Sequence, residues 1–327
     1  MAGLLRINTR TRQISREEPA GEYAGLGGRG LTSRIIRREV PPTCHPLGPS
    51  NKLIVAAGLL TGTSAANSGR ISVGGKSPLT GTIKEANSGG SFSQKLARLD
   101  IIGLILEDKP GPDAAWKTLV INRQGAELVD SPELGGLGTY EASARLFDRY
   151  GDKVGVMVIG PAGENHRLAS SIQFTDPRGN PCRAAGRGGL GALMGSKKIK
   201  AVVVDSQGAE PLQMADPEGF KEAAKRWAEI LMNHPVTGQG LPSFGTSILI
   251  NIINEAGTLP TKNFRQGRFD QAGDISGEKM VELINQRGGT AREGCHAGCV
   301  IQCSQKYCDE KGEYLTAGFE YETVWAF

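Results

Sequence analysis

Three cysteines at intervals of four residues constrain this 327-residue chain more than any other feature of its sequence. Cys295, Cys299 and Cys303 form a C-x3-C-x3-C pattern, and Cys308 follows shortly after. If the segment is helical, each step of four residues turns by about 400°, so the three thiols lie along one face. The chain has six cysteines, too few for a disulfide scaffold, and four of them fall here. Such clustering favours a metal site.

The spacing alone leaves the identity of the metal open. Three cysteine thiolates with a fourth ligand from elsewhere fit a 4Fe-4S cluster. Cys308 or His296 could supply a fourth ligand within the segment, which would suit zinc, although structural zinc more often shows paired cysteine knuckles. A third interpretation is that the thiols are buried apolar groups on a core helix and bind no metal.

Glycine-rich segments are the second constraint. The chain has 46 glycines, roughly twice the usual share of about 7%. Three stretches, 60–70, 76–90 and 182–195, combine glycine and small residues with a cation. Exposed main-chain N–H groups beside an arginine or lysine are typical of an anion or phosphate pocket. Ordinary tight turns are the alternative for each stretch, and none matches a known nucleotide-binding loop.

The order of apolar runs predicts an α+β fold. Alternating or continuous apolar residues predict strands, and apolar positions at helical spacing predict helices. The predicted strands are 4–8, 52–57, 71–73, 101–106, 118–122, 154–159 and 199–204, and the predicted helices of this part are 30–38, 92–99 and 140–150, the last capped by Thr139. A turn at 123–125 suggests a hairpin, which argues against a simple Rossmann alternation.

A polar break near residue 210 predicts a domain boundary, with domains 1–208 and 209–327. The second part has long helical patterns: 217–232 after an Asp216 cap, 246–255, and 276–286. Trp227, on the first of these helices, is expected to lie in the hydrophobic core. The final segment 320–327 is rich in apolar residues and has no helix stop signal, so we expect the chain to be truncated.

Charge and hydropathy argue against two kinds of partner, nucleic acid and the membrane interior. The formal net charge of +4 comes from 38 basic and 34 acidic residues spread along the chain, so nucleic acid is not suggested. The apolar run 53–60 is far shorter than the ~20 residues that span a bilayer. A soluble cytoplasmic protein without a membrane span is therefore expected.

Together, these segments resemble the aldehyde ferredoxin oxidoreductase family, whose motifs occur in the same order. The resemblance covers essentially the whole chain. It is carried by the segments Leu-Arg-Ile-Asn at 5–8, Lys-Leu-Ile-Val-Ala-Ala-Gly-Leu-Leu-Thr-Gly-Thr-Ser at 52–64, Lys-Ser-Pro-Leu-Thr-Gly at 76–81, Asn-Ser-Gly-Gly at 87–90, Ile-Gly-Pro-Ala-Gly-Glu-Asn at 159–165, Arg-Ala-Ala-Gly-Arg-Gly-Gly at 183–189, Gly-Leu-Pro-Ser-Phe-Gly-Thr at 240–246, the cysteine cluster and Glu-Tyr-Glu-Thr-Val-Trp at 320–325.

The resemblance implies an N-terminal saddle of two β-sheets with flanking helices, followed by part of a mostly helical domain. A tungsten or molybdenum bis-pterin cofactor would lie on the saddle, with magnesium held by the main-chain carbonyls of Asn87 and Ala184. Arg70 would lie between the pterin and the iron–sulfur cluster, and Arg183 near the pterin phosphates. The full set of cofactor-binding residues implied in this way is Arg70, Asn87, Ser88, Gly89, Gly90, Arg183, Ala184, Gly186 and Arg187.

The resemblance also implies a reaction and a catalytic residue. Cys295, Cys299 and Cys303 would hold a 4Fe-4S cluster, and Glu322 would be a carboxylate beside the metal, suited to acid/base work. The implied reaction is oxidation of an aldehyde to a carboxylic acid, with electrons leaving through the cluster to ferredoxin or a ferredoxin-like subunit. A homodimer is also implied. The fourth cluster ligand, the active-site histidine and later pterin motifs of the family would lie beyond residue 327, so the fragment alone is expected to be inactive.

One departure from the family pattern leaves the substrate open. The commoner cluster spacing in the family is C-x2-C-x3-C, whereas this chain has C-x3-C-x3-C. The main enzymatic alternative is therefore the tungsten subunit of a benzoyl-CoA reductase-like complex. The non-enzymatic alternative is a zinc- or cluster-binding electron-transfer module. The sequence does not distinguish tungsten from molybdenum.

Overall fold

The computed structural model describes residues 3–326, which form two compact units. The first unit comprises Met1–Ser64 and Ser68–Ala215, and the second comprises Ala65–Asn67 and Asp216–Phe327. A short piece of the N-terminal half of the sequence thus belongs to the second unit.

The first unit contains two six-stranded mixed sheets with flanking helices, which confirms the predicted α+β class. The strand order of the first sheet is β2-β1-β6-β3-β4-β5. All neighbouring pairs in it are antiparallel except β1 and β6, which are parallel. Its strands are β1 (Gly3–Asn8), β2 (Ile14–Glu17), β3 (Leu53–Ala57), β4 (Ile71–Lys76), β5 (Ile83–Ser88) and β6 (Ile101–Glu107).

The second sheet has the order β11-β10-β9-β12-β7-β8. Its strands are β7 (Lys117–Asn122), β8 (Gly125–Asp130), β9 (Gly155–Val158), β10 (Ile172–Phe174), β11 (Arg183–Ala185) and β12 (Ile199–Val204). β7 and β8 form the hairpin that the turn at 123–125 predicts. All seven predicted strands are present within one to three residues of their expected ends.

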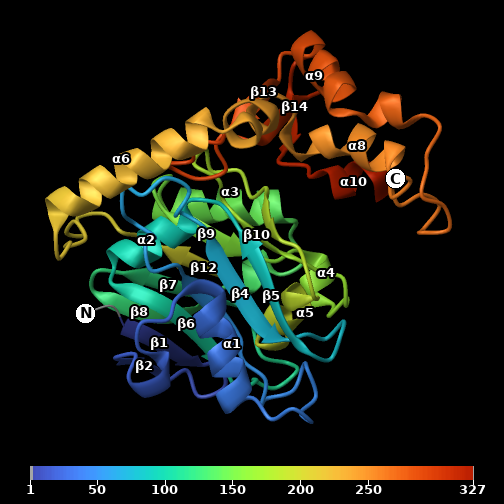
Figure 1. Cartoon of the computed structure of the whole chain (residues 1–327). Coiled ribbons are helices and arrows are strands. Elements are labelled where there is room, and N and C mark those ends of the chain that lie inside the picture. The colour runs from blue at the N-terminus through green and yellow to red at the C-terminus, as the bar shows by residue number, and fades with distance from the viewer. Residues whose placement is uncertain (1–2, 327) are drawn as a thin grey trace. The chain divides into compact units, whose positions relative to one another are not determined.

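The two sheets share one core because their central strands are apolar on both faces. In β3, Leu53, Val55 and Ala57 belong to the core cluster that also contains residues of the second sheet. The alternate residues Ile54 and Ala56 instead pack with helix α1 (Gly28–Glu39), which lies against β3 and β4 (Figure 1).

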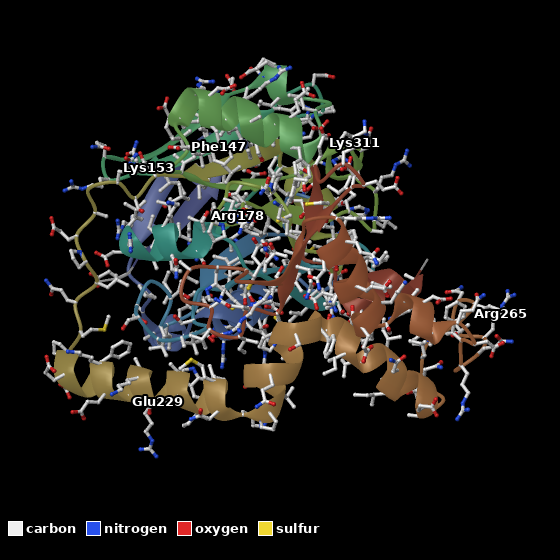
Figure 2. The ribbon with its side chains drawn as sticks, turned by 90° about the horizontal axis from the view of Figure 1, so that it is seen from above. Phe147, Lys153, Arg178, Glu229, Arg265 and Lys311 are labelled. Carbon is white, nitrogen blue, oxygen red and sulfur yellow. The ribbon has the colours of Figure 1, made fainter. Side chains whose placement is uncertain are left out.

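The second sheet is covered in the same way. Val156 and Val158 of β9 pack with Ala142 and Leu146 of α3 (Thr139–Tyr150). Phe147 on the same helix is labelled in Figure 2 and packs against this cluster. The order of layers is therefore helix, sheet, sheet, helix. Three shorter helices complete the first unit: α2 (Phe92–Arg98), α4 (Pro161–Glu164) and α5 (Leu190–Ser196).

The second unit is mostly helical with a small sheet of order β13-β14-β15. Its helices are α6 (Pro217–Asn233), a π-helical turn Pro235–Gly240, α7 (Leu241–Phe244), α8 (Leu249–Glu255), α9 (Gly277–Gln286) and α10 (Tyr321–Ala326), and its strands are β13 (Thr290–Glu293), β14 (Ser304–Cys308) and β15 (Tyr314–Ala317). The side chains of Asp216 and Ser276 accept hydrogen bonds from the first turns of α6 and α9. The predicted Asp216 cap is thus confirmed.

Three local predictions were wrong. Thr139 is not a cap, because Gly138 precedes α3 and no side chain caps it. The predicted helix 246–255 begins instead as a 3-10 turn, Gly245–Ile248, before α8. Trp227 is 46% exposed rather than in a core, although its indole N–H donates to the Ala66 carbonyl at 3.2 Å. α6 buries none of its side chains, so its apolar spacing does not mark a core face.

Within residues 3–326, the helices are too short or too polar to cross a bilayer.

Candidate functional site

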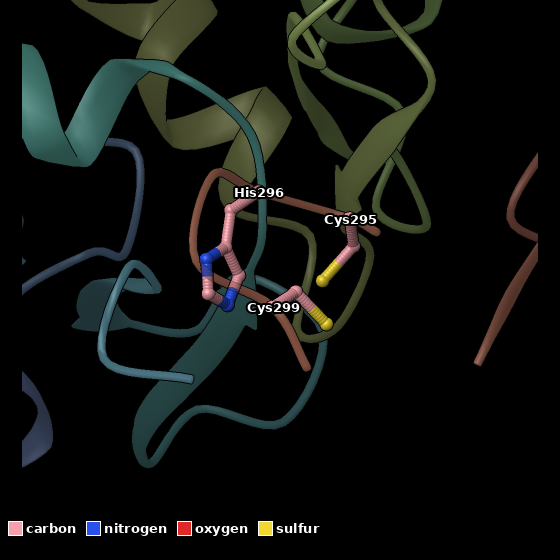
Figure 3. A group of neighbouring side chains, drawn as sticks. All are labelled: Cys295, His296 and Cys299. Atoms are coloured by element: carbon pink, nitrogen blue, oxygen red, sulfur yellow. The ribbon is translucent and has the colours of Figure 1, made fainter. Parts of the chain in front are cut away.

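The cysteine segment is an irregular loop between β13 and β14, and the helical geometry considered from its spacing is wrong. The loop nevertheless gathers ligand atoms. One ligand atom each from Cys295, His296 and Cys299 lies within 4.8 Å of the other two. Figure 3 shows the sulfur atoms of Cys295 and Cys299 side by side, with the imidazole of His296 next to Cys299. The conformation of the loop, and not a helical repeat, therefore brings these ligand atoms together.

Hydrogen bonds to the sulfur of Cys299 favour its thiolate form, which is the form that binds metals. A hydrogen bond from Cys295 lowers the pKa of Cys299 to about 5, and burial acts against this shift. The main-chain N–H of Gln302 donates to the sulfur at 3.3 Å, which also favours the thiolate. Cys299 is 8% exposed.

His296 is buried, at 3% exposure, and its Nδ1 lies 2.8 Å from the carbonyl oxygen of Ala297. A carbonyl only accepts, so this contact assigns the proton to Nδ1 and leaves the lone pair on Nε2. A main-chain carbonyl that orients an imidazole in this way is the usual support of a metal-binding histidine.

The other two cysteines of the segment are outside this close group. Cys303 pairs with Glu293 in an isolated parallel bridge beside β14. Cys308 lies within β14, is 3% exposed, and its thiol is 3.7 Å from the carbonyl of Gly288. Among the residues that the structure describes, the group of converging donors is thus two thiols and one imidazole.

A second candidate site lies in the first unit, where the edge strands of the two sheets meet. β5 is the last strand of the first sheet, β11 is the last strand of the second, and the two are in contact. Ser77 donates its hydroxyl to the Gly188 carbonyl at 2.7 Å. A Cβ on Gly90, which has a φ of +107°, would lie 2.7 Å from the Thr175 carbonyl oxygen. Glycine is therefore required for this close approach.

The exposed face of this junction carries the residues implied to hold magnesium. Asn87 and Ala184 are both exposed, Asn87 on β5 and Ala184 on β11. Arg70, directly before β4, donates from Nε to the Asn87 side-chain oxygen and from Nη2 to the Asn87 main-chain oxygen at 3.4 Å. Asn87 and Ala184 thus lie on two contacting strands, and Arg70 is hydrogen-bonded to Asn87.

The neighbouring residues divide between exposed and buried positions. Ser88, Gly89 and Gly90 are buried, whereas Gly186 and Arg187 are exposed in the turn between β11 and α5. A Cβ on Gly186 would meet only the Ala184 methyl group, at 3.7 Å, so the space above this turn is open.

Arg183 is 5% exposed and faces the opposite side of β11 from Ala184. Its Nη2 lies 3.9 Å from Asp176, whose carboxylate is also 3.5 Å from the Cys182 thiol. Arg183 is therefore part of a buried cluster beneath the exposed turn.

The exposed face of the junction has the chemistry that an anionic cofactor needs. The main chain around Gly186 is exposed, Arg187 follows it, and Arg70 is hydrogen-bonded to Asn87 on the contacting strand β5. Main-chain N–H groups and guanidinium groups are the donors that phosphate requires.

Glu322 lies in the first turn of α10 and is partly exposed. The main-chain N–H of Tyr321 donates to the Thr246 hydroxyl at 3.0 Å, and Val324 and Trp325 pack on the apolar cluster around Ile250. Helix α10 is thus held on both sides of Glu322, which fixes the backbone at this residue.

Asn67 was not among the predicted site residues, yet its side chain contacts the cysteine loop. Its side-chain nitrogen is 3.7 Å from Cys299 Sγ. The only signal in the sequence is its place within the glycine-rich stretch 60–70, because its partner lies 232 residues away.

Comparison with known proteins finds one family along the whole chain. The model of the aldehyde ferredoxin oxidoreductase N-terminal domain matches residues 4–206. The model of domains 2 and 3 of aldehyde ferredoxin oxidoreductase matches residues 222–327. The two matches cover both units.

Individual relatives agree. The chain is 40% identical over 326 residues to a tungsten-containing aldehyde ferredoxin oxidoreductase of Pyrococcus furiosus, covering 98% of this chain and 51% of that protein. It is 41% identical to the protein of the same description from Pyrococcus horikoshii, covering 99% of this chain and 51% of the relative. The chain therefore spans about half the length of the curated relatives it matches.

A solved structure is also similar. The active-site complex BamBC of benzoyl coenzyme A reductase, in complex with 1,5-dienoyl-CoA, contains a chain with a TM-score of 0.76 and 26% identity. The similarity covers 97% of this chain and 48% of that one.

Proposed function

This chain belongs to the aldehyde ferredoxin oxidoreductase family, and we propose that it is part of a tungsten- or molybdenum-pterin enzyme that oxidises an aldehyde to a carboxylic acid. The observation that carries the proposal is the 40% identity, over 98% of the chain, to a tungsten-containing aldehyde ferredoxin oxidoreductase. Tungsten has more support than molybdenum because two relatives, 40% and 41% identical to this chain, are described as tungsten proteins.

We propose that the junction of β5 and β11 holds the phosphates of the pterin cofactor. The main-chain carbonyls of Asn87 and Ala184 would hold magnesium, and both residues are exposed on the contacting strands β5 and β11. Oxygen ligands suit this hard cation. Ser88, Gly89, Gly90, Gly186 and Arg187 would line the cofactor, with Arg183 supporting the turn from below.

The cysteine loop would hold a 4Fe-4S cluster through Cys295, Cys299 and Cys303. Support comes from the nearness of two of the thiols and from the lowered pKa of Cys299. A fourth ligand would complete the cluster. His296 is the nearest additional donor among the described residues, and zinc bound with His296 is the competing assignment.

The proposed reaction converts an aldehyde and water to a carboxylic acid, two protons and two electrons. When bound, the metal–pterin group would supply the two-electron redox chemistry. The role proposed for Glu322 is to accept a proton at its carboxylate, or to orient water toward the substrate carbonyl. The electrons would leave one at a time through the cluster to ferredoxin or a ferredoxin-like subunit. We also propose a homodimer.

The test is metal, sulfide and pterin analysis of the full-length protein purified without oxygen, together with a Cys299→Ala variant. Tungsten or molybdenum with pterin, and about four iron and four sulfide lost in the variant, would support the proposal. Zinc or no metal, with no pterin, would overturn it and favour the electron-transfer or structural module. The loaded enzyme would then be assayed with aldehydes.

A second candidate is the active-site subunit of a benzoyl-CoA reductase-like complex. It is favoured by the structural similarity to the BamBC complex at a TM-score of 0.76. Reduction of an aromatic thioester by the loaded protein, without aldehyde oxidation, would select this alternative.

A further inference from the structure

Two hydrogen bonds bind Asn67 to the cysteine loop, and a third binds Ala66 to α6. The main-chain N–H of Asn67 donates to the Gly298 carbonyl at 3.1 Å, and the N–H of Val300 donates to Asn67 Oδ1 at 3.1 Å. The indole of Trp227 donates to the Ala66 carbonyl at 3.2 Å. These contacts explain why residues 65–67 belong to the second unit rather than the first.

The NH2 group of the Asn67 side chain contacts the sulfur atom of Cys299. Its Nδ2 lies 3.7 Å from Cys299 Sγ, within hydrogen-bond reach of sulfur. The contact with Val300 sets the orientation of the amide, because a main-chain N–H must face the carbonyl oxygen and not the NH2 group. The NH2 group is thereby directed at Cys299.

The residue type suits the backbone as well as the contact. Asn67 has a φ of +62°, in the left-handed region. Asparagine enters this region more readily than most residues with a side chain. An asparagine can therefore make the turn and present an N–H donor to the sulfur at once.

We propose that Asn67 is a positioning residue that tunes the redox centre by donating a hydrogen bond to the sulfur of Cys299. The inference rests on the proposed 4Fe-4S cluster. Reduction adds negative charge to the cluster sulfurs, and an N–H donor stabilises that charge, so the bond raises the reduction potential. The Gln302 N–H, at 3.3 Å from the same sulfur, acts in the same direction. Outer contacts of this kind commonly set the properties of a bound metal.

The test is a redox titration of the metal-loaded full-length protein, followed by electron paramagnetic resonance of the reduced cluster. Asn67→Asp keeps an oxygen for the Val300 N–H but loses the donor to sulfur. Asn67→Gly removes the donor without adding charge and keeps the positive φ accessible. We expect both variants to lower the midpoint reduction potential of the cluster. The expected change is a tenfold increase in the ratio of oxidised to reduced cluster at a fixed potential, which is about 59 mV for one electron.

Asn263→Asp is the matched control. Asn263 is exposed in the same unit, has a φ of +56°, and lies in the turn enclosed by the bridged residues Thr261 and Gln266. Asn263→Asp adds the same charge at a residue that also has a left-handed backbone conformation, and it should leave the midpoint potential of the cluster unchanged. Iron and sulfide are counted in every sample.

The outcomes separate the two proposals. A wild-type protein without iron and sulfide overturns the proposed function and this inference with it. Intact clusters with equal midpoints in wild type and both Asn67 variants overturn the inference alone. A downward shift in Asn67→Asp and Asn67→Gly, absent in Asn263→Asp, supports it.

Discussion

The side-chain nitrogen of Lys197 lies 2.8 Å from the main-chain oxygen of Asp108, to which it donates a hydrogen bond. A second bond, of 2.7 Å, joins the same nitrogen to the main-chain oxygen of Asn51. Lys197 ends α5 just before the second sheet, whereas Asp108 follows β6 and Asn51 precedes β3 in the first sheet. One fully buried lysine thus ties the second sheet to adjacent strand ends of the first.

We expect Lys197 to make the stability of the protein depend on pH. Burial, and then the charge of Lys52, lowers the pKa of Lys197 from 10.5 to about 7. Above pH 7 the unfolded chain therefore keeps a proton that the folded chain has lost. The contribution of this group to the free energy of unfolding rises with pH from about 7 to about 10.5, by up to ~1.4 kcal/mol per pH unit.

Urea unfolding of wild type and Lys197→Met between about pH 7 and pH 9 measures this contribution. The difference in free energy of unfolding between the two proteins should grow in favour of wild type as pH rises. Lys153→Met, at an exposed lysine, is the control. Parallel curves for wild type and Lys197→Met would contradict the prediction.

Glu39 stabilises the first unit through an ion network that acid should break. Burial alone would raise its pKa, but hydrogen bonds from Arg6 and Tyr23 outweigh burial and lower the pKa of Glu39 to about 2. A depressed carboxyl pKa contributes stability above the unfolded value, near 4.5, which is lost as pH falls toward 2. Glu39→Gln should cost about 1–3 kcal/mol at neutral pH.

Denaturant unfolding at neutral pH and near pH 2.5 tests this prediction. The difference in free energy of unfolding between wild type and Glu39→Gln should be smaller near pH 2.5 than at neutral pH. Glu18→Gln, at an exposed carboxylate, should have little effect on the free energy of unfolding at either pH. A gap that stays constant with pH would show that the loss is one of packing and not of charge.

Gly90→Ala should disrupt the junction of the two sheets. The added methyl group would lie 2.7 Å from the Thr175 carbonyl oxygen, and alanine is strained at a φ of +107°. We expect a loss of roughly 1–3 kcal/mol from strain, with more from the clash. Thermal or urea unfolding measures it, and pterin content should fall if the junction holds the cofactor.

Gly136→Ala separates the two causes. Gly136 also has a positive φ, +79°, but nothing lies within 4 Å of its would-be Cβ. It should lose stability from strain only. Equal losses for Gly90→Ala and Gly136→Ala would mean that the contact with Thr175 is unimportant.

Glu322→Gln should lower aldehyde oxidation by about 100- to 10,000-fold if the carboxylate transfers a proton in the reaction. Tungsten, iron and pterin contents should be unchanged, because glutamine keeps the shape of glutamate and the role proposed for Glu322 is proton transfer and not metal binding. Steady-state kinetics of the loaded full-length protein measures the effect. Glu310→Gln, at a carboxylate with an 88% exposed side chain, is the control. Full activity of Glu322→Gln would remove this residue from the mechanism.

Local features were predictable because short stretches of sequence decide them. The apolar runs at 52–57 and 199–204 predicted strands, and the strands found there, β3 and β12, are buried along their whole length. The cap at Asp216 was predictable because its hydrogen bond spans only three residues. The short strands β10, β11, β13, β14 and β15 were missed because their runs of three to five residues carry little periodicity.

The sequence by itself determined the family, the α+β class and the identities of the cysteines and glycines that the proposed cofactors need. Only the tertiary structure decided which of them meet. The approach of β5 to β11, the convergence of His296 with Cys295 and Cys299, and the bond from Asn67 to Cys299 all depend on how the chain folds back on itself. Contacts between residues so far apart arise from the packing of whole sheets and loops, and no local pattern of polarity or spacing encodes them.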